Sequence, residues 1–207
     1  MANLIELLKG QLMDDNTLGQ LSNQIGAEPQ QTAVATRGIL NTLVNALARN
    51  ASTPEGAANL NNALERDHDG GIFDQLSGFL GGNAQVANPR TANGAGILEH
   101  ILGGQQSGAV DMISKVSGLS GGQTGSLMEK LAPVVMGMLG KQKQQGGLDI
   151  GSLVGMLSGT VQQQKQSGSP LMDLANRFLD KDGDGSALDD VASMVGGKLL
   201  GGLFGRR

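Results

Sequence analysis

Leu21-Ser-Asn-Gln-Ile-Gly26 and Ile113-Ser-Lys-Val-Ser-Gly118 are two versions of one segment, and they lie 92 positions apart in the chain. At that offset, five apolar residues after the first segment fall on five apolar residues after the second: Ala35, Ile39, Leu43, Ala46 and Leu47 on Leu127, Leu131, Val135, Met138 and Leu139. The spacing places all five on one face of an α-helix. The sequence therefore predicts a long amphipathic helix in each of two diverged repeats.

The ends of the two repeats also match. Leu64-Glu-Arg-Asp-His-Asp-Gly-Gly-Ile-Phe-Asp-Gln-Leu76 aligns with Leu179-Asp-Lys-Asp-Gly-Asp-Gly-Ser-Ala-Leu-Asp-Asp-Val191, at an offset of 115. The second repeat is therefore 23 residues longer than the first (115 minus 92). The additional length falls in Gln- and Gly-rich stretches at 141–147 and 162–169, which we interpret as helix ends and loops.

The composition indicates the fold class. Hydrophobic residues make up 39% of the chain and aromatic residues 2%, so the core must consist of Leu, Ile, Val, Met and Ala. Leu, Met and Ala favour helices, and no alternating apolar pattern is long enough for a strand. The sequence therefore predicts an all-α protein of two tandem helical repeats, joined by a Gly/Asn/Ala-rich linker.

We place the first helical unit at 1–82, the linker at 83–96 and the second unit, with its Gln/Gly insertions and apolar Gly-rich tail, at 97–207. The expected helices of the first unit lie near 3–12, 16–25, 29–49, 54–65 and 72–80. Those that follow lie near 94–103, 107–117, 121–141, 149–163, 169–179 and 187–200. Pro133 is expected to kink or break its helix.

This set of features resembles the YidB-like bacterial family, a domain of unknown function, present here in two diverged copies. The resemblance rests on the short Leu4-Ile-Glu6 helix with its counterpart Ile97-Leu-Glu99, on the Leu21–Gly26 segment with the long helix after it, and on the closing Asp182–Asp190 motif. It covers most of the chain. It implies an all-helical fold and carries no assigned activity.

The second repeat contains the first half of an EF-hand-type calcium loop. Asp180, Asp182 and Asp184 stand at alternate positions and are followed by Gly185 and Ser186. Such loops place oxygen ligands at positions 1, 3 and 5, a Gly at position 6 and a backbone carbonyl at position 7. Position 12 here is Val191, so the closing ligand would have to come from Asp189 or Asp190. The candidate calcium ligands are therefore Asp180, Asp182, Asp184, Ser186, Asp189 and Asp190.

A turn without metal is the alternative for the same residues. Ser186 and Asp189 form a capping-box-like pattern, and Asp-Gly pairs are common in turns. Capping needs one Asp, however, whereas three neighbouring carboxylates repel one another unless a cation is present. The first repeat offers a decayed version of the loop, in which Glu65 replaces the leading Asp and His68 is inserted.

Several enzyme classes lack their sequence signature. There is no Cys, which excludes disulfides, thiolate metal sites and Cys nucleophiles. The two His residues, His68 and His100, are too few for a zinc site, and we expect both at the surface. We therefore predict that the chain is not an enzyme. A hydrolase with an acidic site at Asp189 or Asp190 is one alternative.

A second alternative is binding to nucleic acid. Residues 21–36 are similar to a helix-turn-helix, in which the second helix would present Gln30, Gln31 and Arg37. The net charge of −4 provides no basic footprint, so DNA binding is the weaker reading and a helical corner is favoured. The N-terminus is not expected to be a signal peptide, no stretch is long enough for a membrane span, and we expect a cytoplasmic protein.

The hypothesis that fits these observations best is a non-catalytic helical scaffold or interaction protein, stabilised by calcium and associating with itself. Seven Met residues lie in the second repeat, most of them at core spacing. The tail Gly196–Arg207 combines Leu and Phe with two terminal Arg and is the candidate for self-association. The sequence suggests neither a small-molecule substrate nor the identity of a partner.

Overall fold

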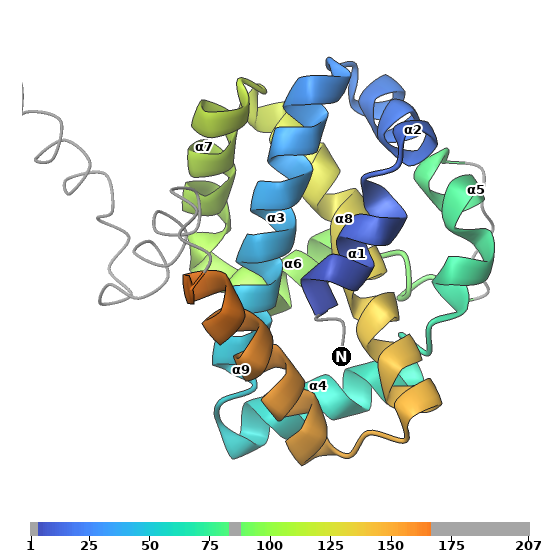
Figure 1. Cartoon of the computed structure of the whole chain (residues 1–207), viewed down its shortest axis with the longest axis vertical. Helices are drawn as coiled ribbons and strands as arrows, with labels where there is room; N and C mark the ends of the chain where they lie inside the picture. The colour runs from blue at the N-terminus through green and yellow to red at the C-terminus, as the bar shows by residue number, and fades with distance from the viewer. Residues whose placement is uncertain (1–3, 83–87, 167–207) are drawn as a thin grey trace, which may run out of the picture.

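A computed structural model describes residues 4–82 and 88–166, apart from the side chains of Asp74 and of residues 164–166 (Figure 1). The first repeat contains helices α1 (Leu4–Leu12), α2 (Asp15–Ile25), α3 (Pro29–Asn50), α4 (Pro54–Arg66) and α5 (Leu76–Leu80), with a 3-10 turn, η1 (Gly71–Gln75), before α5. The chain continues with α6 (Gly94–Leu102), the 3-10 turn η2 (Gly103–Gln105), α7 (Gln106–Ser117), α8 (Gly121–Gly146) and α9 (Ile150–Gln166). The described ranges contain no strand, which confirms the all-α prediction.

Local sequence signals set most helix ends. Asp14 caps α2 by accepting a hydrogen bond from the backbone N–H of Thr17 at 3.0 Å, and Thr53 caps α4 in the same way. Ser120 and Gln123 form a reciprocal capping box at the start of α8. Gly26 and Gly118 end α2 and α7 in the left-handed conformation, with φ of 63° and 77°, which glycine adopts without steric cost.

Two expectations about the helices need correction. The helix predicted at 72–80 is divided into η1 and α5. A break at Pro133 is wrong, because α8 runs through this residue and continues to Gly146. Pro133 and its neighbours are buried, and this packing offsets the backbone hydrogen bond that proline removes. The Gln-rich residues after Lys141 continue α8 to Gly146, within the interpretation of this stretch as helix ends and loops. The helices expected at 169–179 and 187–200 lie outside the described residues.

Both repeats contribute to one hydrophobic core around the two long helices. α3 and α8 lie against each other at the centre, and the ten residues that the repeat pattern placed on their apolar faces are all buried. Each long helix also contacts helices of the other repeat: α3 contacts α6 and α7, whereas α8 contacts α1 and α2. Figure 1 shows α7 on one side of this pair and α2 with α5 on the other. The repeats therefore pack with approximate two-fold reciprocity.

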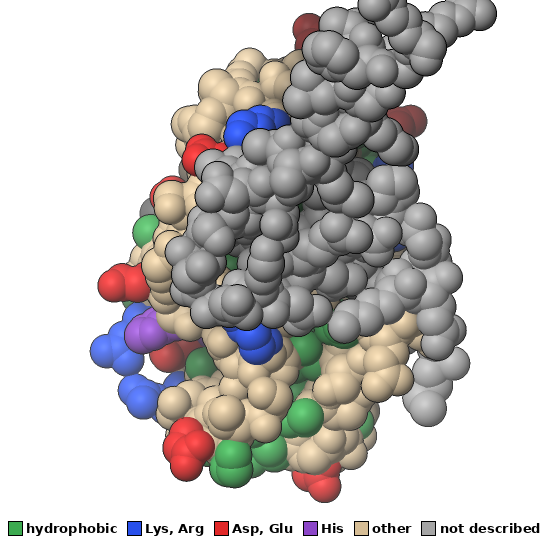
Figure 2. All heavy atoms as spheres, turned by 90° about the vertical axis from the view of Figure 1, so that its left-hand side faces the viewer, with side chains coloured by type: hydrophobic (Ala, Val, Ile, Leu, Met, Phe, Trp, Pro, Cys, Tyr) green, Lys and Arg blue, Asp and Glu red, His purple; other side chains and the backbone are tan. Residues whose placement is uncertain are grey.

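The surface does not gather one kind of charge where it can be seen. On the visible described part of the face in Figure 2, acidic and basic side chains are interspersed, and no broad area of Lys and Arg stands out. None of the described helices combines the length and the hydrophobicity that a bilayer crossing requires.

Candidate functional site

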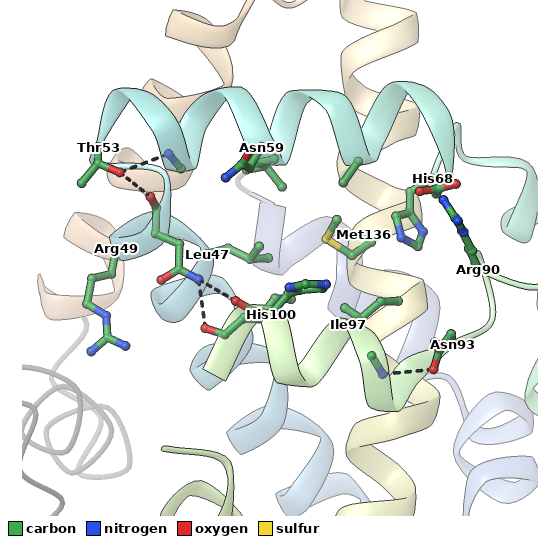
Figure 3. Close-up of a pocket in the computed structure, with 17 residues that line it drawn as sticks. Leu47, Arg49, Thr53, Asn59, His68, Arg90, Asn93, Ile97, His100 and Met136 are labelled. Carbon is green, nitrogen blue, oxygen red and sulfur yellow. Dashed lines mark hydrogen bonds between the residues drawn. The ribbon is translucent and has the colours of Figure 1, made fainter. Parts of the chain in front are cut away.

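A groove of about 920 Å³ separates α4 from α6 (Figure 3). α4 forms one wall and α6 the other, while Met136 of α8 lies between them in the middle of the groove. The apolar side chains that line it are Leu47, Leu60, Ala63, Ile97, Ile101 and Met136. The polar and charged side chains are Arg49, Asn50, Thr53, Asn59, Asp67, His68, Arg90, Asn93 and His100. The site thus has an apolar interior and polar ends.

Hydrogen bonds at the helix ends hold the two walls in place. Asn50, at the end of α3, donates its side-chain amide to the carbonyl oxygen of Ile101 at 3.0 Å and so ties α3 to α6. Thr53 accepts from the backbone N–H of Gly56 at the start of α4, and Asn93 does the same for Gly96 at the start of α6. Both walls are therefore fixed by caps within the groove lining.

His68 lies at one end of the groove and is buried, with 4% of its surface exposed. The expectation that it lies at the surface is therefore wrong, whereas His100 is exposed as predicted. Its Nδ1 atom has no hydrogen-bond partner within the described residues, and Figure 3 shows the ring pointing into the groove beside Arg90. Burial lowers the pKa of His68, and the negative charges of Asp67 and Asp69 oppose this effect only in part. The imidazole is therefore neutral at pH 7.

Two glycines of α8 explain why His68 is buried. A Cβ atom at Gly140 would lie 1.6 Å from the carbonyl oxygen of His68, and one at Gly137 would lie 2.4 Å from Ile72. The turn after α4 therefore packs directly on the backbone of α8, where no side chain stands in the way. Gly70, in the same turn, has a φ of 96° and approaches Lys141 closely. Residues far away in the sequence thus determine the position of the imidazole.

Arg90 stands at the same end of the groove as His68 (Figure 3). Its neighbours fix its backbone, because Asn88 donates to the Asp67 carboxylate at 3.1 Å and Thr91 donates to the Asp67 carbonyl at 2.6 Å. Its guanidinium forms no hydrogen bond or ion pair with another described residue. The exposed Arg90 guanidinium, which has no partner among the described residues, therefore lies beside the buried, neutral imidazole of His68.

The opposite end of the groove is also basic but more constrained. The Arg49 guanidinium donates to the side-chain oxygen of Gln105 at 2.6 Å, which ties the end of α3 to η2. His100 lines the wall between the two ends. With two Arg and one Asp, the lining carries more positive than negative charge, in contrast to the net charge of −4 of the chain. Such a groove fits an apolar molecule that carries a negative group.

The sequence-predicted metal ligands Asp180, Asp182, Asp184, Ser186, Asp189 and Asp190 lie outside the described residues. In the first repeat, Glu65 pairs with Lys143 at 2.5 Å and accepts from Asn61, and this contact lowers its pKa. The Asp69 carboxylate accepts from the backbone N–H of Gly71 at 3.0 Å. No group of three metal-ligating side chains occurs within the ranges that the structure describes. The first turn therefore uses its carboxylates for contacts within the protein.

The possible helix-turn-helix is the corner between α2 and α3. Gln31, one of the residues expected to face DNA, donates its side-chain amide to the carbonyl oxygen of Gly118. The rest of α3 is buried along most of its length and lies against α6, α7 and α8. Gln30 and Arg37 are exposed. The second helix of this corner thus has a structural role at the centre of the core.

The groove itself had no signature in the sequence. Its residues come from α3, α4, α6 and α8, from the turns before and after α4 and from the segment between α5 and α6, and no local spacing connects them. The one local signal was His68 between two Asp in a turn that otherwise resembles a metal loop. This irregularity marked the residue that now occupies the end of the groove.

Comparison with known proteins agrees with the repeat and the helical fold. No curated protein and no solved structure matches the chain. The family described as "Bacterial protein of unknown function (DUF937)" matches residues 6–142 and 149–207. These two segments cover most of the sequence, as expected for two diverged copies of a YidB-like unit. The chain therefore belongs to this family of bacterial proteins of unknown function.

Proposed function

We propose that this chain is a non-catalytic helical interaction protein that binds an apolar ligand with an anionic head group in the groove between α4 and α6. The observation that carries the proposal is the groove end where the His68 ring lies beside the exposed Arg90 guanidinium. The Nδ1 atom of His68 is itself buried and has no partner among the described residues, and such an atom costs about 1–3 kcal/mol. An anionic ligand at this end would give the Arg90 guanidinium a partner that the described residues do not supply.

The chemistry of the groove end favours an anion. A neutral imidazole has an N–H to donate, and a guanidinium binds a carboxylate through two parallel hydrogen bonds. His68 and Arg90 together can therefore hold a carboxylate at this end. Leu60, Ile97 and Met136 would then lie along the apolar part of the ligand. The volume of about 920 Å³ falls within the range typical of small-molecule sites.

A tryptophan reporter tests the proposal, since the chain contains no Trp. Asn59 is exposed and lines the groove, so Asn59→Trp places a single fluorophore at its rim. Decanoate, used below its micellar concentration, is the probe. We expect a saturable change in fluorescence with Asn59→Trp and none with Gln11→Trp, which lies on α1 outside the groove.

The head group is tested by comparing probes and variants. Decanoate should bind more tightly than decanol or decyltrimethylammonium. In the Asn59→Trp background, Arg90→Gln should weaken decanoate binding about ten-fold or more, because a hydrogen bond to a charged group is lost. Arg37→Gln, an exposed Arg on α3 away from the groove, is the matched control. If all three probes bound equally, the anionic head group would be rejected. If none of the three bound, the groove would be rejected as a ligand site.

A second proposal concerns calcium at Asp180, Asp182, Asp184, Ser186, Asp189 and Asp190. Its support is the aligned turn of the first repeat, where Gly70 has a φ of 96° and Asp69 accepts from a backbone N–H two residues later. These features suit position 6 of a calcium loop, which needs a glycine for its sharp turn. In the first repeat the Lys143 ammonium takes the carboxylate of the leading residue, Glu65. The second repeat has Asp at all three alternate positions.

Native mass spectrometry of the full chain with calcium tests this second proposal. We expect one bound ion in the unmodified chain and none in the double variant Asp182→Asn, Asp184→Asn. Asp69→Asn in the first repeat is the matched control and should leave the bound ion in place. A thermal unfolding curve that is identical in millimolar calcium and in chelator would count against the site. The same spectra report whether the chain forms homo-oligomers.

A further inference from the structure

In the first repeat, the closing helix α5 packs against α2. Gln20 of α2 donates to the hydroxyl of Ser77 at 2.9 Å, and Gln24 donates to the carbonyl oxygen of Gly81 at 2.8 Å. Leu80 is fully buried at this contact, and Leu76 and Phe79 pack against the core beside it. α5 therefore covers the outer face of α2 that contains Gln20 and Gln24.

The second repeat presents an equivalent face on α7. At the offset of 92, Gln20 falls on Met112 and Gln24 falls on Val116. Two polar residues that bind α5 are thus replaced by two apolar residues. Val116 is 40% exposed and is one of two exposed large hydrophobic residues in the part of the chain that the structure describes, the other being Ile150. No described helix covers this face of α7 as α5 covers α2.

We propose that residues 187–200 of the same chain dock on α7 over Met112 and Val116, as α5 docks on α2. The alignment of the repeats places Phe79-Leu-Gly-Gly82 on Met194-Val-Gly-Gly197, so at this offset of 115 the segment is the counterpart of residues 72–85, which include most of η1, all of α5 and the residues after it. Leu188, Val191, Val195 and Leu199 follow the spacing of one helical face. An apolar stripe on the segment therefore matches an apolar face on α7.

The length of the chain permits this contact. α9 ends at Gln166, so the 20 residues 167–186 connect it to the docking segment. An extended chain of that length spans up to about 66 Å. The loss of the two glutamines also agrees with the proposal, because an apolar contact needs no side-chain donors. The α7 face is thus the place where the second repeat completes its copy of the α2–α5 pair.

Cross-linking in the full chain tests the docking, since the sequence contains no Cys that would interfere. The test variant is Val116→Cys with Val195→Cys, treated with a short bis-maleimide. Gln24→Cys with Gly81→Cys is the positive control, because these residues are in contact in the first repeat. Ser77→Cys with Val195→Cys is the negative control, because α5 lies on the opposite side of the molecule from α7 (Figure 1).

The expected result is an intrachain cross-link whose yield approaches that of the positive control. A yield no higher than that of the negative control would overturn the proposal. Covalent dimers in place of intrachain products would overturn it too, because the occupant would then be a second copy. As a separate measurement, Val116→Ser should lower the midpoint of thermal unfolding more than Ile150→Ser does. An equal effect at these similarly exposed sites would also count against docking.

Discussion

Gln123 donates its side-chain amide to the carbonyl oxygen of Gly26 at 2.8 Å, and its counterpart Gln31 donates to the carbonyl oxygen of Gly118 at 3.2 Å. The two bonds are equivalent in the repeat alignment, because the two glutamines are separated by 92 positions and so are the two glycines. Each glutamine occupies the third position of a long helix, and each glycine ends the short helix of the other repeat. The two repeats are therefore joined by a reciprocal pair of hydrogen bonds, as the subunits of a two-fold symmetric dimer are.

Removal of the two glutamine amides should have unequal effects on stability. Gln31→Ala loses one exposed hydrogen bond between the repeats and should lower the free energy of unfolding by about 0.5 kcal/mol. Gln123→Ala also loses the capping box with Ser120, so we expect a decrease of about 1 kcal/mol. Unfolding in urea measures both values.

Gln123→Glu separates the two contributions at this position. The carboxylate still accepts from Ser120 as in a capping box, but it cannot donate to Gly26. Its stability should therefore fall between those of the unmodified chain and Gln123→Ala. A loss as large as that of the alanine variant would show that the cap contributes little.

Gly140 should be among the least tolerant positions of α8. A methyl group there would collide with the backbone of His68. This backbone can move away only if the turn after α4 no longer packs on α8. We expect Gly140→Ala to lower the free energy of unfolding by about 1–3 kcal/mol or more. Gly125→Ala is the control, since a Cβ at that site of the same helix meets nothing within 4 Å. It should stabilise the protein by up to about 1 kcal/mol. Similar losses for the two variants would contradict the close contact.

His68 should make stability depend on pH. Burial lowers its pKa in the folded chain below the ordinary value of 6.5, so below pH 6.5 the unfolded chain binds a proton that the folded chain does not. As far as His68 is concerned, the free energy of unfolding is highest above pH 6.5. It decreases as the pH falls towards the folded-state pKa, by at most about 1.4 kcal/mol per pH unit. His68→Leu should remove this part of the pH dependence. His100→Gln, at an exposed site, should retain it when urea unfolding is measured between pH 7.5 and 5.

The sequence predicted those parts of the structure that depend on local chemistry. The periodic apolar residues around Ile39 and Leu131 predicted the two long helices, and the structure confirms them. The structure adds further local signals at the helix ends, namely the caps at Asp14 and Thr53 and the left-handed glycines at 26 and 118. Pro133 was misjudged because its local cost is outweighed by the packing of a helix that is buried at the centre of both repeats. Propensity is a weak prior when tertiary contacts are this extensive.

The groove could not be predicted, because it depends on which distant residues meet. His68 lies in a polar turn of the sequence, yet Gly137 and Gly140 allow that turn to sink onto α8. The sequence near residue 68 does not show that this residue packs against glycines about 70 positions later. The interpretation of the first Asp/Gly turn as a decayed calcium loop stays a prediction, and the contacts with Lys143 and Asn88 show what the carboxylates of Glu65 and Asp67 bind within the protein.

Asp67 offers the sharpest test of the charge balance at the groove end. Its carboxylate accepts from Asn88, and its charge opposes an anion held by Arg90. Asp67→Asn retains a side-chain oxygen for Asn88 but removes the negative charge. Decanoate should therefore bind about three-fold more tightly to this variant, measured by titration of the Asn59→Trp reporter, since one nearby repulsive charge is lost. The same change removes a charge that raises the pKa of His68, so the loss of stability in acid should extend to lower pH.

Glu55→Gln, on α4 but outside the groove lining, is the matched control and should change neither quantity. If Asp67→Asn instead weakened decanoate binding, the carboxylate would have to orient Arg90 for the ligand, and the simple charge argument would fail.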